Sequence, residues 1–214
     1  MKTLAAFVFV IFASICASAQ DEIKKAEFFA GYSYGNAGVN FGIGPAGEQV
    51  YQDRVHQHGF NASGVYNVSR YFGIKGDVSG TYKSELLAFP VPTGIQSSPT
   101  ITVVFTGNMA LYNFLGGVQI KDNVKKTRFK PFAHAMVGAG YRKNEIEGGP
   151  FVCITIIPCP GNTNETGFAG AFGGGLDVRL NKHISLRIFQ VDYNPIKFNA
   201  GTDHNFRLST GLVF

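Results

Sequence analysis

The chain has 214 residues, enough for one domain, and it holds 27 Gly, 20 Phe and 9 Tyr but only 15% charged residues. Soluble globular domains carry about 25% charged residues, so this composition argues against a surface that meets water on all sides. The net charge of +5 is scattered and forms no basic stripe between stacking aromatic residues, which excludes a nucleic-acid-binding protein.

The N-terminal segment has the pattern of a cleavable secretion signal. A lysine at the second position is followed by an uncharged apolar run over residues 4–16 and then by the small residues Ala-Ser-Ala. We expect residues 1–19 to be removed, so that the mature chain begins at Gln20. Lipid attachment at Cys16 is an alternative, but it would need a small residue before the cysteine, where this chain has a bulky isoleucine.

The mature chain, residues 20–214, contains no apolar run of the roughly 18 residues that a membrane helix needs. From about Lys25 onward, apolar and polar residues instead alternate with a period of two, in segments of about ten residues. Such segments have the length that a tilted strand needs to cross a bilayer.

Eight of these segments follow one another, and each has an apolar and a polar face. In chain order, the apolar faces carry Phe28, Ala30, Tyr32 and Tyr34; Phe60, Ala62, Gly64 and Tyr66; Phe72, Ile74, Val78 and Tyr82; Tyr112, Phe114, Val118 and Ile120; Ala133, Ala135, Val137 and Tyr141; Phe168, Phe172, Leu176 and Val178; Leu186 and Ile188; and Phe206, Leu208, Thr210, Leu212 and Phe214. Residues on the opposite faces include Ser33, Asn61, Ser63, Asn67, Ser79, Thr81, Asn113, Gln119, His134 and Ser209.

The seventh segment changes step within its length. Its first residues alternate around Arg187, but Gln190 and Asp192 then fall on the parity of the apolar face. One extra residue in a strand exchanges its two faces. We therefore expect a β-bulge near Ile188 and Phe189.

The connections between segments alternate in length. Those at 67–70, 121–127 and 180–183 are short, whereas those after the first, third, fifth and seventh segments are longer and hold most of the Pro, Gly and Ser. Short periplasmic turns and long outer loops are typical of outer-membrane barrels, and closure leaves no unpaired edge in lipid. The sequence therefore predicts an all-β fold, an eight-stranded antiparallel up-and-down transmembrane β-barrel.

The charges indicate which face meets lipid, because a soluble lipocalin-like barrel would also alternate but would hold its apolar residues inside. The apolar faces carry no charge, and a Lys or Arg at mid-bilayer on the lipid face costs roughly 2 to 4 kcal/mol. We therefore expect a lumenal charge network made of Glu27, Lys75, Asp77, Lys130, Arg142, Asp177, Arg179, Arg187, Asp192 and Arg207.

Aromatic residues fall at two heights along the predicted strands, as the two interfaces of a membrane require. The set near the outer ends is Tyr34, Tyr82, Tyr112, Tyr141 and Tyr193, and the set near the periplasmic ends is Phe28, Tyr66, Phe72 and Phe214. A lipocalin-like barrel gives no reason for such girdles.

The chain resembles the OmpA/OmpX-like family of eight-stranded outer-membrane barrels over residues 25–214. The resemblance lies in the signal peptide, in the stretch 59–68, in the Gly-rich run 173–179 and in the closing strand 206–214. It implies that barrel assembly machinery reads the closing strand, whose alternate apolar positions are Phe206, Leu208, Leu212 and Phe214. The chain departs from the full OmpA pattern by ending at the barrel, so we expect neither a peptidoglycan-binding domain nor a cell-wall tether.

An eight-stranded barrel is just wide enough for side chains to fill it. We therefore expect the lumenal charges to form ion pairs that occupy the lumen, with a narrow ion path as the alternative. Cys153 and Cys159 remain after removal of the signal, and in an exported protein such a pair predicts a disulfide that closes a small loop.

Two histidine patterns could carry chemistry. His56 and His58 share one strand face, but no third ligand is evident, and we expect histidines of the outer rim and no metal site. His183-Ile184-Ser185 is similar to the His-x-Ser arrangement of barrels that remove acyl chains from lipid A. This motif lies beside a periplasmic turn, however, and only Asp192 and Asp203 could supply the orienting carboxylate.

Taken together, the sequence predicts a non-enzymatic protein of the cell outer membrane, without a cofactor. Its role would be structural or one of surface interaction through long extracellular loops, since loops carry function more readily than the scaffold does. The expected partners are outer-membrane lipid, lipopolysaccharide and the barrel assembly machinery, and the expected state is a monomer. A narrow porin-like channel is the first alternative, and a lipid A-modifying enzyme the second.

Overall fold

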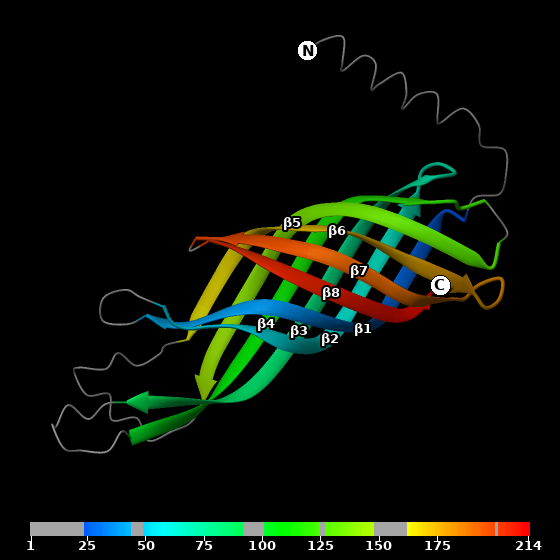
Figure 1. Cartoon of the computed structure of the whole chain (residues 1–214). Helices are drawn as coiled ribbons and strands as arrows, with labels where there is room; N and C mark the ends of the chain where they lie inside the picture. The colour runs from blue at the N-terminus through cyan, green and yellow to red at the C-terminus, as the bar shows by residue number, and fades with distance from the viewer. Residues whose placement is uncertain (1–23, 44–48, 92–100, 125–126, 148–161, 200) are drawn as a thin grey trace, which may run out of the picture.

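The computed structural model describes residues 24–43, 49–91, 101–124, 127–147, 162–199 and 201–214 (Figure 1). The predicted signal peptide and the two cysteines at 153 and 159 lie outside these ranges. None of the described segments is a helix long and apolar enough to cross a membrane.

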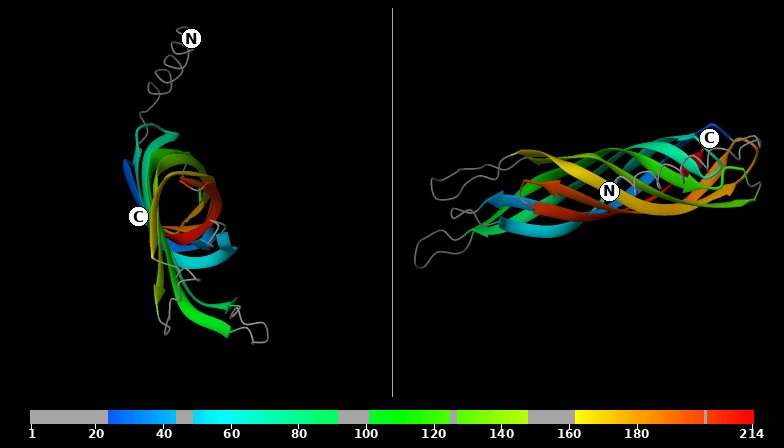
Figure 2. Two further views of the ribbon diagram at one scale, coloured as in Figure 1. Left: turned by 90° about the vertical axis from the view of Figure 1, so that its left-hand side faces the viewer. Right: turned by 90° about the horizontal axis from the view of Figure 1, so that it is seen from above.

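Eight antiparallel strands form one closed barrel in which each strand pairs with its neighbours in sequence and β1 pairs with β8 (Figures 1 and 2). This arrangement confirms the predicted fold class. The strands are β1 (Ala26–Ile43), β2 (Gln49–Asn67), β3 (Phe72–Val91), β4 (Ile101–Lys121), β5 (Phe129–Glu147), β6 (Thr163–Arg179), β7 (Ser185–Phe198) and β8 (Gly201–Val213).

The two ends of the barrel differ. We call the end where β1 begins and β8 finishes the terminal end; it also holds the short turns β2–β3, β4–β5 and β6–β7. We call the opposite end the loop end. The strands have 13 to 21 residues, more than the ten or so that cross a bilayer, so several continue beyond the membrane at the loop end.

The connections predicted to be long after the first and seventh segments are shorter in the structure, since β1 and β2 pair as far as Ile43 and Gln49. The link between β7 and β8 was expected to be long, but the two strands pair as far as Phe198 and Gly201 and leave a tight turn. The Pro and Gly residues of this stretch suggested a loop. Pro195 is tolerated within β7 because the β6–β7 register is interrupted there, and the side-chain amide of Asn194 donates to the Gly170 carbonyl at 2.6 Å in place of a ladder bond.

The predicted bulge in β7 is confirmed. The β7–β8 register shifts between Arg187 and Gln190, and the β6–β7 register shifts opposite the same place. Ile188 and Phe189 are both exposed, whereas the residues on either side of them, Arg187 and Gln190, are buried. The extra residue therefore keeps Gln190, Asp192 and Asn194 on the same inner face as Arg187.

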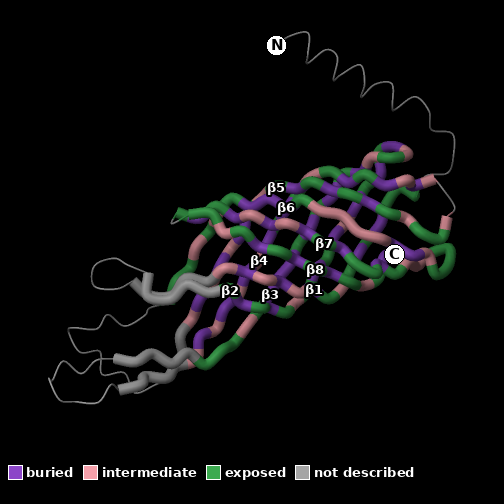
Figure 3. The backbone as a smooth tube through the Cα atoms, in the orientation of Figure 1, coloured by how far each residue is buried: buried purple, intermediate pink, exposed green. Residues whose placement is uncertain are grey.

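Burial alternates along the strands as the sequence predicts (Figure 3). The outer wall exposes large apolar side chains such as Phe28, Tyr66, Ile74, Phe114 and Phe168. Val178 departs from this pattern, because it is buried although it pairs with exposed Phe129 and Leu186. A wall of exposed apolar residues around a polar interior inverts the arrangement of a soluble protein, and it suits a barrel surrounded by hydrocarbon.

The lumen also contains an apolar layer that the sequence did not predict. Its members are buried on the inner faces of their strands: Ala37, Leu111, Leu115, Met136, Ala169, Ala171, Ile196 and Phe198. This layer, which we call the apolar plug, lies toward the loop end, since Met136 follows His134 along β5 and Ile196 follows Asp192 along β7. Ion pairs were predicted to fill the lumen, but they occupy only the part of it outside the apolar plug.

Candidate functional site

At the terminal end of the lumen, Lys121 from the end of β4 lies between two carboxylates. Its Nζ is 2.6 Å from Oε2 of Glu27 and 2.9 Å from Oδ2 of Asp177. Arg187 from β7 joins the same group, with Nε 2.8 Å from Oδ1 of Asp177. All four side chains are buried, so their charges are balanced by one another rather than by water.

Two aromatic rings hold the Arg187 guanidinium in place. Its central carbon lies 4.3 Å from the ring centroid of Phe29 and 4.2 Å from that of Phe132. Both rings are buried in the lumen, whereas most phenylalanines in the described part of the chain are exposed on the outer wall. A desolvated cation over an aromatic face gains about 2 kcal/mol, which fixes the position of this arginine in the network.

A second group of charges centres on Arg207 of β8. Its Nη2 is 2.6 Å from Oδ2 of Asp192, and its Nη1 is 2.8 Å from Oδ1 of Asp77. His134 lies on the other oxygen of Asp192, with Nε2 at 2.8 Å, and Lys75 Nζ lies 3.3 Å from Nδ1 of that histidine. Strands β3, β5, β7 and β8 are thus tied together across the lumen.

Gln190 joins the two groups. Arg187 donates to Oε1 of Gln190 at 2.6 Å, and Nε2 of Gln190 donates to Oδ2 of Asp192 at 2.8 Å. The β-bulge makes this link possible, because without it the parity of Gln190 would point outward. One continuous lumenal network therefore runs from Glu27 to Asp77, and each bond in such a buried network strengthens its neighbours.

The structure separates the ten charged residues that the sequence assigned to the lumen. Seven lie in the lumenal network, and Lys121 joins them although the sequence suggested that it lies in a turn. Lys130 and Arg179 lie outside it: Lys130 is partly exposed, and Arg179 donates to the Asn181 carbonyl in the β6–β7 turn. Both residues lie at strand ends, where the barrel opens to water. At such positions a side chain on the inner face of the strand can still be exposed to solvent.

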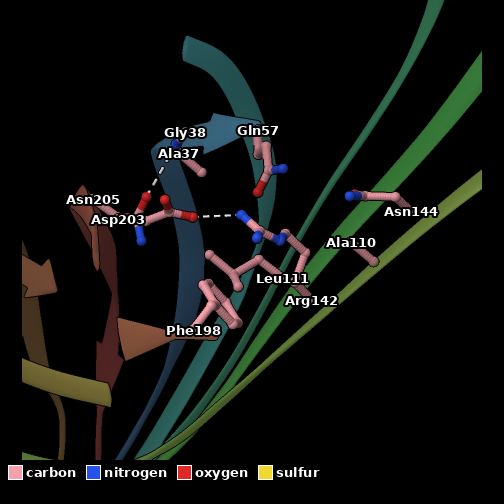
Figure 4. Close-up of a pocket in the computed structure, with 10 residues that line it drawn as sticks. All are labelled: Ala37, Gly38, Gln57, Ala110, Leu111, Arg142, Asn144, Phe198, Asp203 and Asn205. Atoms are coloured by element: carbon pink, nitrogen blue, oxygen red, sulfur yellow. Dashed lines mark hydrogen bonds and ion pairs between the residues drawn. The ribbon is translucent and has the colours of Figure 1, made fainter. Parts of the chain in front are cut away.

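Arg142, the tenth residue, forms a separate group at the loop end (Figure 4). It donates to Oε2 of Glu165 at 2.5 Å and to Asp203, and its guanidinium carbon lies 4.1 Å from the centroid of the Phe198 ring. A small pocket opens beside it, and its polar lining includes Asn205, whose Oδ1 accepts from the Gly38 amide at 3.1 Å. The acids of this group come from segments interpreted as loops in the sequence.

Seen along the barrel axis, the lumen therefore holds three layers: the lumenal network, the apolar plug and the Arg142 group. The first and third carry paired charges, and the plug between them includes inward polar neighbours such as Asn113, between Leu111 and Leu115, and Asn194. Side chains fill the lumen of an eight-stranded barrel at this level, so an ion would have to lose its hydration shell to pass. This layering favours a closed lumen over an ion path.

Beyond the loop-end rim, the barrel wall splits. The β2–β3 register ends at His58–Tyr82, whereas β1–β2 pairing continues to Ile43–Gln49 and β3–β4 pairing continues to Val91–Ile101. Two ribbons consequently extend away from the barrel and diverge in Figure 1. We call them the β1–β2 ribbon and the β3–β4 ribbon; within the described ranges, the edge of β3 at 83–91 has no neighbouring strand on the β2 side.

The two histidines of β2 lie on the outer wall. Nδ1 of His56 is 2.5 Å from the Tyr34 hydroxyl, and Nδ1 of His58 is hydrogen-bonded to that of Tyr32. His204 on β8 bonds the Tyr193 hydroxyl in the same way. Among the described residues, no group of three potential ligands could hold a metal ion, so these histidines are rim residues beside the aromatic girdle.

The His183-Ile184-Ser185 motif lies at the β6–β7 turn. Neither carboxylate that the sequence offered accompanies it there. Asp192 is buried and bonded to His134, and Asp203 binds Arg142 at the loop end. Neither Asp192 nor Asp203 is therefore placed to orient His183 as its use in acyl transfer would require.

The closing strand places its predicted assembly residues on the outer wall. The side chains of Phe206, Leu208, Leu212 and Phe214 are all exposed. The backbone amide and carbonyl of Phe214 exchange hydrogen bonds with those of Phe28, at 2.8 and 3.1 Å. The last residue thereby helps to close the barrel.

The family model described as "Outer membrane protein beta-barrel domain" matches residues 7–214. No curated protein sequence gives a significant match. Solved structures of the same shape include Ail of Yersinia pestis in complex with the heparin analogue sucrose octasulfate, with a TM-score of 0.53 at 15% identity, covering 89% of this chain and 99% of Ail.

Neisserial surface protein A matches with a TM-score of 0.56 at 12% identity, covering 89% of this chain and 98% of that protein. OprG from Pseudomonas aeruginosa matches with a TM-score of 0.50 at 9% identity, covering 92% and 98%. At such identities, these likenesses concern the fold.

Proposed function

The chain belongs to the outer membrane protein beta-barrel domain family, and on that premise we propose that it is a surface-interaction protein whose β3–β4 ribbon binds an extended segment of a partner polypeptide outside the cell. The barrel itself lies in the outer membrane, as its family implies. The observation that carries the proposal is the split in the wall beyond His58 and Tyr82.

The split leaves backbone groups of β3 free to pair. Residues 83–91 bond β4 on one side, and the described part of β2 does not continue beside them on the other. An unpaired edge is a template for an added strand, and recognition through such an edge takes its affinity from main-chain hydrogen bonds. The sequence of this edge, Lys-Ser-Glu-Leu-Leu-Ala-Phe-Pro-Val, adds apolar positions that favour an apolar partner strand.

The closed lumen supports an interaction role over the porin-like alternative. The apolar plug and the lumenal network occupy the space through which ions would pass. Ail is described as an attachment invasion locus protein, and a comparable surface role for this chain is part of the proposal.

The remaining partners are proposed on the same basis. The chain would be exported by the signal at residues 1–19, folded by the barrel assembly machinery through its closing strand, and kept as a monomer among lipopolysaccharide in the outer leaflet. The tyrosines and histidines of the loop-end wall are amphipathic side chains suited to that interface. No enzymatic step or cofactor is part of the proposed role.

Panning a phage-displayed library of ten-residue peptides against the barrel in nanodiscs tests the proposal. We expect peptides with alternating apolar residues, and we expect their binding to slow amide hydrogen exchange at residues 83–91. The variant Leu86→Lys with Ala88→Lys should lose this binding, because lysines block strand addition at an edge. The matched control is the double variant Asn199→Lys with Thr202→Lys, which adds two lysines to the hairpin where β7 and β8 pair with each other. Equal binding by both variants would rule out the edge.

A further inference from the structure

The terminal end of the barrel carries an excess of cations. They come from the start of the described chain, from the three turns and from adjoining strand ends, and all are exposed or half-buried: Lys24, Lys25, Arg70, Arg128, Arg179 and Lys182. In the same described stretches (24–28, 67–74, 119–124, 127–131 and 178–186), the acids are Glu27, buried against Lys121, and Asp122, ion-paired with Arg70. This rim is therefore strongly positive.

The cations of different strands lie side by side. The amide of Arg179 donates to the Arg128 carbonyl at 2.8 Å, which joins the ends of β6 and β5. On the other side of the barrel, the Asn67 amide and side chain donate to the carbonyls of Lys25 and Lys24, each at 2.8 Å. The positive charges thus follow the rim rather than gather in one hollow.

The depth of this rim is set by exposed aromatic side chains. Arg128 directly precedes Phe129, which is 59% exposed, and Lys25 lies three residues before Phe28, which is 64% exposed. Aromatic residues of this kind mark the level where hydrocarbon meets headgroups. Cations just outside them consequently lie at the depth of the phosphate groups.

The loop end does not share this charge. Lys143 Nζ lies 2.7 Å from Oε1 of Glu145, and Arg142 bonds both Glu165 and Asp203. There described acids such as Glu85, Glu145, Glu165 and Asp203 accompany the bases, so the positive excess belongs to the terminal end. Because short turns face the periplasm in outer-membrane barrels, that end meets the periplasmic leaflet.

We propose that the cationic rim of the terminal end selectively binds anionic phospholipid headgroups of the periplasmic leaflet. The ligand is a phosphodiester headgroup with a net negative charge, of the phosphatidylglycerol type. A soluble acidic partner is the other possible source of such charge, but the arrangement favours lipid, since the cations ring the barrel beside its lipid-facing aromatics. This inference rests on the outer-membrane placement of the barrel and is independent of strand binding at the loop end.

Spin-labelled lipids at the boundary of the barrel give a direct test. The full chain without its signal is reconstituted in phosphatidylcholine vesicles, and the relative association of labelled phosphatidylglycerol and phosphatidylcholine is measured. Each Lys or Arg near an anionic surface strengthens association roughly fivefold at low ionic strength, and salt screens this effect. We expect the barrel to prefer phosphatidylglycerol severalfold and to lose the preference in about 1 M salt.

The rim variant combines Lys25→Gln, Arg128→Gln and Lys182→Gln, and the matched control combines Lys83→Gln, Lys143→Gln and Lys197→Gln at the loop end. Both remove three charges, and a heat-modifiability gel verifies that both fold. Loss of the preference in the rim variant alone supports the proposal. An unselective wild-type barrel, or equal loss in both variants, would overturn it. Rim-dependent binding to a soluble polyanion such as polyglutamate without lipid selectivity would assign the surface to a soluble acidic partner and overturn the lipid assignment.

Discussion

Arg187 and Asp177 form an enclosed ion pair in the lumen, with Nε 2.8 Å from Oδ1 and both side chains 1% exposed. The arginine also lies between two phenylalanine rings and donates to Gln190. A single pair thus connects the terminal-end charges, the aromatic packing and the central charges. Its removal should affect the stability of the whole barrel.

We predict that Arg187→Leu lowers the free energy of unfolding by about 3 to 5 kcal/mol, since it leaves the Asp177 carboxylate buried and without its arginine partner. Urea titration in detergent, read by the heat-modifiability gel, measures the change. Lys182→Leu at an exposed turn removes the same charge and should cost less than about 1 kcal/mol. Equal midpoints for the two variants would show that the lumenal network does not stabilise the barrel.

Lys121 and Glu27 should depend on each other energetically. Lys121→Met leaves the Glu27 carboxylate buried without its ion-pair partner, and Glu27→Gln leaves Lys121 with Asp177 alone, whereas the double variant removes both charges of the pair. We therefore expect the double variant to be more stable than the sum of the single losses predicts, by about 0.5 to 3 kcal/mol. Unfolding of the four proteins in one double-mutant cycle measures this coupling. Strict additivity would mean that the two side chains do not interact in solution.

Two-residue alternation of apolar and polar side chains could predict some residues of the lumenal network and not others. Charged residues stand out where a strand is otherwise apolar, so Asp77, Asp177 and Arg207 were assigned correctly to the inner face. The parity break in β7 likewise pointed to the bulge. Lys121 was missed because it ends a strand at a point where the pattern suggested a turn, and two-residue periodicity gives no information at strand ends.

The apolar plug was missed for a different reason. Leu111, Leu115 and Ile196 lie on the inner face, but their strands also carry apolar residues on the outer face. Where both faces are apolar, alternation cannot show which residues face lipid and which fill the lumen. Closure of the barrel, which brings these positions together from five strands, is needed to reveal the plug.

The plug leads to a prediction about conductance. The wild-type barrel in a planar bilayer should show no steady open steps, because the side chains packed at the level of the plug leave too little room for a hydrated ion. Replacing Leu111, Leu115 and Phe198 together by serine should admit water and produce small steps. As a control, Phe114, Val118 and Phe206 of the outer wall are replaced together by serine, and this variant should show no conductance steps. Steady steps in the wild-type protein would favour the porin-like alternative.

The closing strand should matter for assembly more than for stability. We predict that Phe214→Ala reduces the amount of folded barrel in cells severalfold. The free energy of unfolding in detergent should change by less than about 1 kcal/mol, because the side chain is exposed and contributes little packing. Phe28→Ala is the matched control, since Phe28 is equally an exposed aromatic residue and is bonded to Phe214 through the backbone. Equal losses in cells for the two variants would remove the special role of the last residue.

The bulge in β7 gives a test of residue count rather than residue type. Deleting Ile188 makes the strand regular, so either Arg187 or the pair Gln190 and Asp192 must then face lipid. An arginine on the lipid face at mid-bilayer costs roughly 2 to 4 kcal/mol, and the deletion also separates Arg187 from Asp177 or Gln190 from Asp192. We therefore expect the deletion to abolish the folded band on the heat-modifiability gel. The control Ile188→Ala keeps the number of residues in β7 unchanged and should fold almost fully. A deletion variant that folds as well as Ile188→Ala would show that the bulge does not determine which residues of β7 face the lumen.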